Sequence, residues 1–275
     1  MYRIAILMTV FNRKESTLSC LKSVYDLCLQ NCYIINVFLT NDGCTDGTPE
    51  EVARNYPEVT IINGNGNLFW NRGMWTAWNV ASKKNFDFYL WLNDDTFLYP
   101  NALEELLKAS SLKDNKSILV GSTKSSKTAI ITYGGYTKDK RYVIPNGDIQ
   151  HVHHFNGNIV LVPRYVYNVL GNLDPFFTHS NGDIDYGMRG NEAGISSFIV
   201  GEYLGECERH TSLDKWCNPD YSLKERWKAL HKPNGMPPKE KFYLQRKHQN
   251  IFVATFHFFT IYLRCFIPQL WRLKK

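Results

Sequence analysis

Two short acidic motifs in this 275-residue chain contain the residue types that catalysis needs. The first is Asn93-Asp94-Asp95, which directly follows the apolar run 86–92. Adjacent carboxylates at the end of a strand suit a hard divalent cation such as Mg²⁺ or Mn²⁺, which in turn binds diphosphate oxygens. A solvated turn is the alternative, because Asn-Asp-Asp sequences also end strands and cap helices. This motif alone leaves both interpretations open.

The second motif contains Asp183 and Asp185, which open a helix-like run. Carboxylates in the first turn of a helix complement its dipole, and this is the structural interpretation. A catalytic interpretation needs one of them as a general base beside a substrate hydroxyl. Farther along the chain, His210 would suit an oxygen-rich metal site, although a lone histidine is more often structural.

The elements that must position these motifs alternate between strand-like and helix-like runs. Buried strands are predicted at 4–10, 33–40, 59–62 and 86–92. Helical spacing of apolar residues fills the intervals between them, so we expect an α/β fold with a mainly parallel central sheet flanked by helices. From 117 to 163 the pattern changes to short β-like stretches broken by turn residues, which predicts an antiparallel insertion or edge.

In their order along the chain, the motifs resemble those of the family 2 glycosyltransferases, inverting enzymes of the GT-A fold. The resemblance covers residues 1–212, which it divides into a nucleotide-sugar half at about 1–100 and an acceptor half at about 101–212. It rests on segments 9–13, 41–48, 65–74, 93–95, 155–158 and 182–189. The second of these reads Asn-Asp-Gly-Cys-Thr-Asp-Gly-Thr, and the last matches the family's "(E/D)DxDxxxR" motif.

The resemblance implies a set of residues that bind the nucleotide-sugar donor: Thr9, Phe11, Asn12, Arg13, Asp42, Asn67, Arg72, Asn93 and Asp94. It also implies that Asp95 and His210 hold Mn²⁺ or Mg²⁺. The sequence departs from the family pattern at Asn93 and Gly182, where acidic residues are common. These departures motivate an alternative, namely a catalytically inactive relative that serves as a binding or scaffold subunit.

On the acceptor side, the resemblance implies that Asp183 is the catalytic base and that Asn156, Gly157 and Asp185 lie near the acceptor. The expected reaction moves a sugar from a UDP- or dTDP-sugar to a hydroxyl of a glycan or lipid-linked saccharide. A single displacement inverts the anomeric centre, so no separate nucleophile is expected.

The charge of the chain is unevenly distributed. The net charge is +6, but residues 1–223 hold 20 basic and 24 acidic residues, while residues 224–275 hold 12 basic and 2 acidic residues. The two parts therefore carry −4 and +10. This asymmetry excludes a uniformly basic nucleic-acid-binding protein and predicts an anionic partner for the C-terminal part.

The chain after residue 212 is predicted to contain two parts. Residues 213–240 are rich in Pro, Lys and Trp and are expected to form an irregular linker. Residues 241–275 form a basic, aromatic, amphipathic segment whose apolar stretch, 251–271, contains His257 and Arg264. Charged residues disfavour a membrane span, so we expect a helix that lies on an anionic membrane surface. A helix packed on the protein itself, or on a second copy in a homodimer, is the alternative.

The predicted location is cytoplasmic, peripheral at the inner face of the plasma membrane. The seven cysteines include no CxxC pair, which favours free thiols in a reducing compartment. The N-terminal run reads as a buried strand, because it lacks the small-residue cleavage site of a signal peptide.

Overall fold

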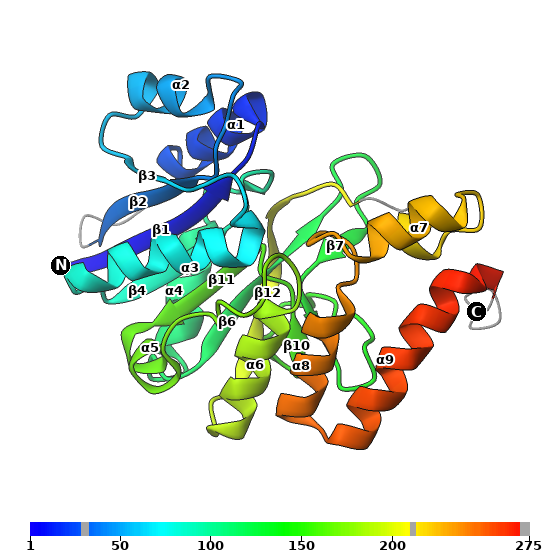
Figure 1. Ribbon diagram of the computed structural model, residues 1–275. Helices are drawn as coiled ribbons and strands as arrows, with labels where there is room; N and C mark the ends of the chain where they lie inside the picture. The colour runs from blue at the N-terminus through cyan, green and yellow to red at the C-terminus, as the bar shows by residue number, and fades with distance from the viewer. Residues whose placement is uncertain (29–32, 210–212, 270–275) are drawn as a thin grey trace.

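The computed structural model describes residues 1–28, 33–209 and 213–269. Within these ranges a ten-stranded mixed sheet has the order β3-β2-β1-β4-β11-β6-β12-β5, with β7 beside β6 and β9 beside β12 (Figure 1). The strands of this sheet are β1 (Tyr2–Val10), β2 (Tyr33–Asn41), β3 (Thr60–Asn63), β4 (Phe88–Leu92), β5 (Phe97–Leu98), β6 (Ile118–Lys124), β7 (Ile131–Tyr133), β9 (Gln150–Val152), β11 (Ile159–Pro163) and β12 (Ser197–Glu206). A second, two-stranded sheet pairs β8 (Gly135–Tyr136) with β10 (His154–Phe155).

Helices cover both faces of the large sheet. In the C-terminal part of the chain, further helices extend beyond the sheet. They are α1 (Lys14–Tyr25), α2 (Thr48–Asn55), α3 (Phe69–Ala81), α4 (Ala102–Ser111), α5 (Arg164–Leu170), α6 (Gly182–Glu192), α7 (Leu223–Leu230), α8 (Pro238–His248) and α9 (Ile251–Phe266). Two short 3₁₀ helices are η1 (Ser82–Lys84) and η2 (Lys215–Cys217).

The predicted α/β architecture is confirmed, and the sheet is parallel where the sequence pattern is most regular. Strands β3, β2, β1 and β4 all run parallel. Strand β11 then pairs antiparallel with both β4 and β6, within the region predicted to be antiparallel. Because β1, β2 and β4 are parallel, their carboxyl ends meet at one edge of the sheet, and the residues after them lie at that edge.

Alternate residues of β1 enter two different cores. Ile4, Ile6 and Met8 face a core built with α1 and α4. Ala5 and Leu7 face a second core built with α3, α5 and α6, which contains the fully buried Trp78 and Trp91. A strand that is buried on both faces reads as a continuous apolar run, as observed in the sequence.

Helix α3 fills part of the interval between the predicted strands 59–62 and 86–92, and it begins at Phe69. The Asp42 carboxylate accepts hydrogen bonds from the backbone N–H groups of Leu68 and Phe69, at 2.9 Å each. These N–H groups at a helix start have no partner within the helix, so this carboxylate caps α3 from 26 residues away in sequence.

The C-terminal region differs from the prediction. Residues 213–240, expected to be an irregular linker, contain η2, α7 and the first turn of α8, and the predicted boundary at 240 falls inside α8. Helix α7 begins with a capping box between Ser222 and Glu225. A third apolar cluster, which includes Cys217, Leu230 and Ile261, joins η2 and α7 to α9. This cluster forms only when α9 folds back, so local composition does not reveal it.

Among the described helices, none has the length and apolar content required to cross a bilayer.

Candidate functional site

Arg13 lies at the N-terminal end of α1, facing the two carboxylates that follow β4. Its guanidinium Nη1 is 2.5 Å from Asp95 Oδ2 and 3.4 Å from Asp94 Oδ1. The positive charge therefore lies beside both acidic side chains. The fold thus brings together three residues that the sequence assigns to donor and metal binding.

The two carboxylates of this motif have different surroundings. Asp94 is buried, and burial raises its pKa to about 7, although Arg13 opposes the shift. Asp95 is more open, with 37% of its side chain exposed. Near neutral pH Asp94 is therefore only partly ionised, and an added cation would favour its charged form.

The side chains at this edge of the sheet provide part of the coordination that a divalent cation needs. The carboxylates of Asp94 and Asp95 could serve as oxygen ligands, and both lie beside the positive charge of Arg13. The described residues contain no group of three or more His, Cys, Asp or Glu side chains that could hold a metal. His210 lies outside the described residues. Such a set suits an ion like Mg²⁺, which keeps water and phosphate oxygens among its ligands.

Asp42 is almost fully buried, with 3% of its surface exposed. Its carboxylate accepts hydrogen bonds from the N–H groups of Gly66, Leu68 and Phe69. Asp42 therefore shapes the loop before α3 and fixes the start of that helix. The contact with a nucleobase implied by the family resemblance stays a prediction.

Three further residues that were predicted to bind the donor, Thr9, Phe11 and Asn12, lie around this edge. Phe11 is 55% exposed, directly after β1. Asn12 adopts the left-handed backbone conformation with φ 51°, and its side-chain oxygen accepts a hydrogen bond from the N–H of Thr45 at 2.7 Å. Thr9 packs so closely on Gly73 that a Cβ atom there would lie 2.1 Å from Thr9 Oγ1.

Two predicted donor residues do not reach the acidic pair through any contact in the described residues. Asn67 is exposed and hydrogen-bonds locally to Asn65. Arg72 donates to the carbonyl oxygen of Pro175 at 2.9 Å, which fastens the loop before α6 to helix α3. The structure therefore gives Arg72 a role in joining the two halves of the domain.

Trp70 connects the edge of the sheet that carries Asp94 and Asp95, here called the donor edge, to the second acidic motif. Its indole Nε1 donates to Asn93 Oδ1 at 2.7 Å. Its ring also covers Gly157, where a Cβ atom would lie 2.5 Å from Trp70 Cζ2. The N–H of Gly157 in turn donates to Asp183 Oδ2 at 3.1 Å. A continuous set of contacts thus links the end of β4 to the predicted base.

Asp183 has no cationic partner among the described side chains. Its carboxylate accepts hydrogen bonds from backbone N–H groups, among them those of Gly157 and Ile184. Loss of hydration raises the pKa of Asp183, and these two hydrogen bonds oppose the shift. A carboxylate with a raised pKa and no counter-cation is suited to accept a proton.

Asn156 directly precedes Gly157, whose N–H binds the Asp183 carboxylate. Its side-chain oxygen accepts a hydrogen bond from the Tyr136 hydroxyl at 2.8 Å, and its N–H bonds to Gly134. Strand pairing between β8 and β10 holds these residues together. Of the predicted acceptor-side residues, Gly157 therefore contacts Asp183, and Asn156 adjoins Gly157 in the chain.

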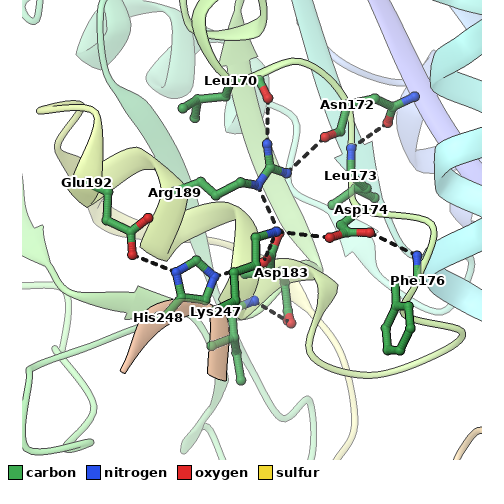
Figure 2. Close-up of polar contacts among 12 residues, drawn as sticks. Leu170, Asn172, Leu173, Asp174, Phe176, Asp183, Arg189, Glu192, Lys247 and His248 are labelled. Carbon is green, nitrogen blue, oxygen red and sulfur yellow. Dashed lines mark hydrogen bonds and ion pairs between the residues drawn. The ribbon is translucent and has the colours of Figure 1, made fainter. Parts of the chain in front are cut away.

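Asp185 is not brought to the acceptor side. It is completely buried, and its carboxylate pairs with Arg189 Nε of the same helix at 2.9 Å and, on α8, with Lys247 Nζ at 2.7 Å and His248 Nε2 at 2.8 Å. Figure 2 shows these three basic side chains. Burial alone would raise the pKa of Asp185, but the hydrogen bonds from His248 and Lys247 hold it below its ordinary value. Since successive residues of a helix point in different directions, Asp183 and Asp185 have different surroundings.

Sequence reasoning missed two side chains near the donor edge. His179 packs against Phe69, with ring centroids 6.2 Å apart, and burial together with the charge of Arg13 lowers its pKa. Its Nδ1 is buried and has no hydrogen-bond partner in the described structure. The Cys207 thiol lies 3.6 Å from Asp95 Oδ1, and burial raises its pKa to about 12. Neither belongs to a motif, and only their proximity in sequence to 182–189 and His210 gave any signal.

Gly182, which departs from the family pattern, is explained by packing. A Cβ atom at this position would lie 1.7 Å from Asn71 Oδ1. The Asn71 amide donates to the carbonyl oxygens of Asp174 and Phe177, at 2.8 and 2.7 Å, which holds it in place. The chain therefore has no room for an acidic side chain before Asp183.

The fold, with carboxylates at the edge of its central sheet, is that of a GT-A-type glycosyltransferase domain. Comparison with known sequences supports this assignment. The sequence model for glycosyl transferase family 2 matches residues 5–170, and the chain belongs to that family. The matched range ends before α6 and does not reach Asp183. A search of curated proteins finds no match.

Several solved structures share the fold. The mannosyltransferase PcManGT from Pyrobaculum calidifontis, in complex with GDP-Man and Mn²⁺, is 14% identical with a TM-score of 0.58; the alignment covers 93% of this chain and 74% of that chain. S. aureus TarS is 10% identical with a TM-score of 0.58, over 76% of this chain and 37% of that chain. TarS 1–349 in complex with UDP is 13% identical with a TM-score of 0.54, over 74% and 59%. The present chain thus matches little more than a third of full TarS, and these likenesses establish the fold.

Proposed function

We propose that the protein is a metal-dependent inverting glycosyltransferase. It transfers a sugar from a nucleoside-diphosphate donor, a UDP- or dTDP-sugar, to a hydroxyl of a glycan or lipid-linked saccharide. The observation that carries the proposal is the set of contacts from Asn93 through Trp70 and Gly157 to Asp183. It holds a carboxylate without a counter-cation beside the edge of the sheet where nucleotides bind in open α/β folds.

Asp183 acts as the general base. A sugar hydroxyl has a pKa far above 7, so it needs a carboxylate within hydrogen-bond reach to take its proton as it attacks the anomeric carbon. The raised pKa of Asp183 increases its affinity for that proton. Attack from the face opposite the leaving group gives inversion in one displacement, with no covalent sugar–enzyme intermediate.

Arg13, Asp94 and Asp95 receive the diphosphate. The Arg13 guanidinium matches phosphate oxygens in charge and geometry. Asp94 and Asp95 would hold Mn²⁺ or Mg²⁺, with His210 proposed as a further ligand. When bound, such an ion neutralises the charge that develops on the leaving diphosphate. PcManGT has been solved with GDP-Man and Mn²⁺ and TarS 1–349 with UDP, which supports a nucleotide-sugar donor.

We further propose that the enzyme works in the cytoplasm as a peripheral protein at the inner face of the plasma membrane. The support is the charge distribution, since residues 224–275 contain 12 basic and only 2 acidic residues. Such a location would suit a lipid-linked acceptor.

An inactive binding subunit is the alternative suggested by Asn93 and Gly182. Both departures have structural roles here: Asn93 accepts the Trp70 indole N–H, and Gly182 leaves space for Asn71. The alternative therefore loses its main motivation.

Thermal shift measurements with UDP, dTDP and GDP, each with and without Mn²⁺, test the donor site. We expect UDP or dTDP to raise the melting temperature only when Mn²⁺ is present. Asp95→Asn should abolish this metal-dependent shift, and Asp183→Asn should retain it as the matched control. Absence of metal-dependent stabilisation by every nucleotide would contradict the proposal.

A further inference from the structure

Helix α9 carries a continuous apolar face that is exposed to solvent. The exposed fractions are 83% for Phe252, 64% for Phe256, 66% for Phe259, 46% for Leu263 and 50% for Phe266. Their spacing places them on one side of the helix. The opposite side of α9, with Ala254, Ile261 and Cys265, is buried. One side of the helix thus packs on the protein, and the other presents aromatic rings to the surroundings.

Helix α7 extends this face. Its Trp227 is 44% exposed, and its ring centroid lies 5.8 Å from that of Phe266. Arg226 fixes the two helices together, because its Nε donates to the carbonyl oxygen of Cys265 at 2.9 Å, in the last turn of α9. Leu223, one turn before Trp227, is 44% exposed. The apolar face therefore spans two helices, one of which lies in the predicted linker.

Two lysines border the part of this face that lies on α7, and the exposed carboxylate of Glu225 lies on the same helix. Lys224 and Lys228 are exposed on α7, next to Leu223 and Trp227. The two acidic residues after position 223 are both engaged: Glu225 in the capping box and with Lys215, and Glu240 with Thr178. Aromatic side chains bordered by lysines match the boundary between the acyl chains and anionic headgroups of a bilayer.

The face has a fixed position relative to the proposed base. Helix α8 lies between α6 and α9 (Figure 1). Its Lys247 and His248 bind Asp185, two residues from Asp183 (Figure 2). Anything that binds the face is therefore held at a defined orientation to the acceptor side.

We propose that α7 and α9 together form a docking surface for an anionic membrane. The aromatic rings of Trp227, Phe256 and Phe259 enter the interfacial region, while Lys224 and Lys228 contact headgroups. A second copy of the chain fits less well, because a symmetric contact would place this lysine-bordered surface against itself. The inference rests on the proposed membrane location and is independent of the proposed chemistry.

Sedimentation of the full-length protein with vesicles tests the docking surface. Vesicles of phosphatidylglycerol and phosphatidylethanolamine should bind the protein, and phosphatidylcholine vesicles should bind it at least tenfold more weakly. The double variant Phe256→Ser/Phe259→Ser should lose at least tenfold in affinity, and Trp227→Ser several-fold. Leu112→Ser, which removes an apolar side chain 74% exposed beyond α4, should have no effect. Lys224→Gln/Lys228→Gln should weaken binding and reduce its salt dependence.

Nucleotide-induced thermal shifts of the same variants separate this proposal from the proposed function. An unchanged shift shows that the variant is folded and that its donor site is intact. Lack of binding to anionic vesicles would overturn the docking surface even if the nucleotide shift were normal. So would a homodimer in light scattering that Phe256→Ser/Phe259→Ser dissociates without any vesicle binding, since the face would then belong to a second copy. A Trp227→Ser variant with full vesicle affinity would remove α7 from the surface and overturn the two-helix proposal.

Discussion

Asp183 and Asp185 lie two residues apart in the first turn of α6, yet the fold surrounds them differently. Asp183 receives only backbone hydrogen bonds, and burial raises its pKa. Asp185 faces Arg189, Lys247 and His248, and its pKa is held low. The carboxylate that we propose as the base thus has no cationic partner among the described side chains, whereas the carboxylate that fastens α6 to α8 pairs with three basic side chains.

The surroundings of Asp94 and Asp95 are intermediate between those of Asp183 and Asp185. There a single Arg13 serves both Asp94 and Asp95, and Asp94 keeps a pKa of about 7. Negative charge is left incompletely neutralised where we propose that a metal ion binds. The comparison therefore distinguishes carboxylates that we propose bind a ligand from Asp185, whose charge is paired within the protein.

The largest expected effect is that of Asp183→Asn on sugar transfer. Loss of a general base lowers rates by roughly 10²–10⁴-fold, and the amide cannot replace it. Release of nucleoside diphosphate in the presence of acceptor measures the rate. Because Asp183 has no ion pair to lose, the melting temperature should change little. Full activity of this variant would end the distinction between the two carboxylates.

Asp185→Asn should mainly lower the stability of the protein. Removing one partner from a buried ion pair costs about 3–5 kcal/mol, because the other charges stay buried without compensation. Urea unfolding gives the free energy. The matched control is Asp139→Asn, which removes a fully solvated partner of Arg141 at 3.6 Å and should cost less than ~1 kcal/mol. Equal effects of the two variants would contradict a structural role for Asp185.

Gly182→Ala should destabilise the start of α6 by about 1–3 kcal/mol, because the new methyl group overlaps Asn71. A double-mutant cycle checks the cause: in an Asn71→Ala background the same substitution should cost clearly less. Gly182→Glu, which restores the residue type common in the family, should lower rather than raise activity. A gain in activity would instead favour the inactive-relative alternative.

The smallest expected effect is a pH dependence that His248 confers. Burial lowers the pKa of His248, but hydrogen bonds to Asp185 and Glu192 raise it above its ordinary value of 6.5 overall. A group with a raised pKa contributes its full stability below pH 6.5 and loses it as the pH rises through the folded-state value. The free energy of unfolding of the native protein, measured by urea unfolding, should therefore fall relative to that of His248→Gln as the pH rises above 6.5. Parallel curves would show that His248 stays neutral beside the two carboxylates.

The sequence alone determined the class of fold and the order of the motifs. Apolar periodicity is a local property, and it located β1, β2 and β4 closely enough to predict that Asp94 and Asp95 follow a buried strand. Parallel pairing then places the ends of these strands at one edge, so the meeting of Arg13 with the acidic pair followed from topology. Gly157 also contacts Asp183, and the acceptor-side role that the family resemblance implies for it stays a prediction.

Only the tertiary structure decided what each carboxylate faces. Two of the three partners of Asp185 come from α8, 62 and 63 residues later, and the group that caps α3 is Asp42 from another loop. Likewise, α7 and α9 form one face only because Arg226 reaches the last turn of α9. Burial and charge pairing depend on contacts between distant segments. Residue type and spacing therefore identify candidate carboxylates, while the packing around each one determines its pKa and its role.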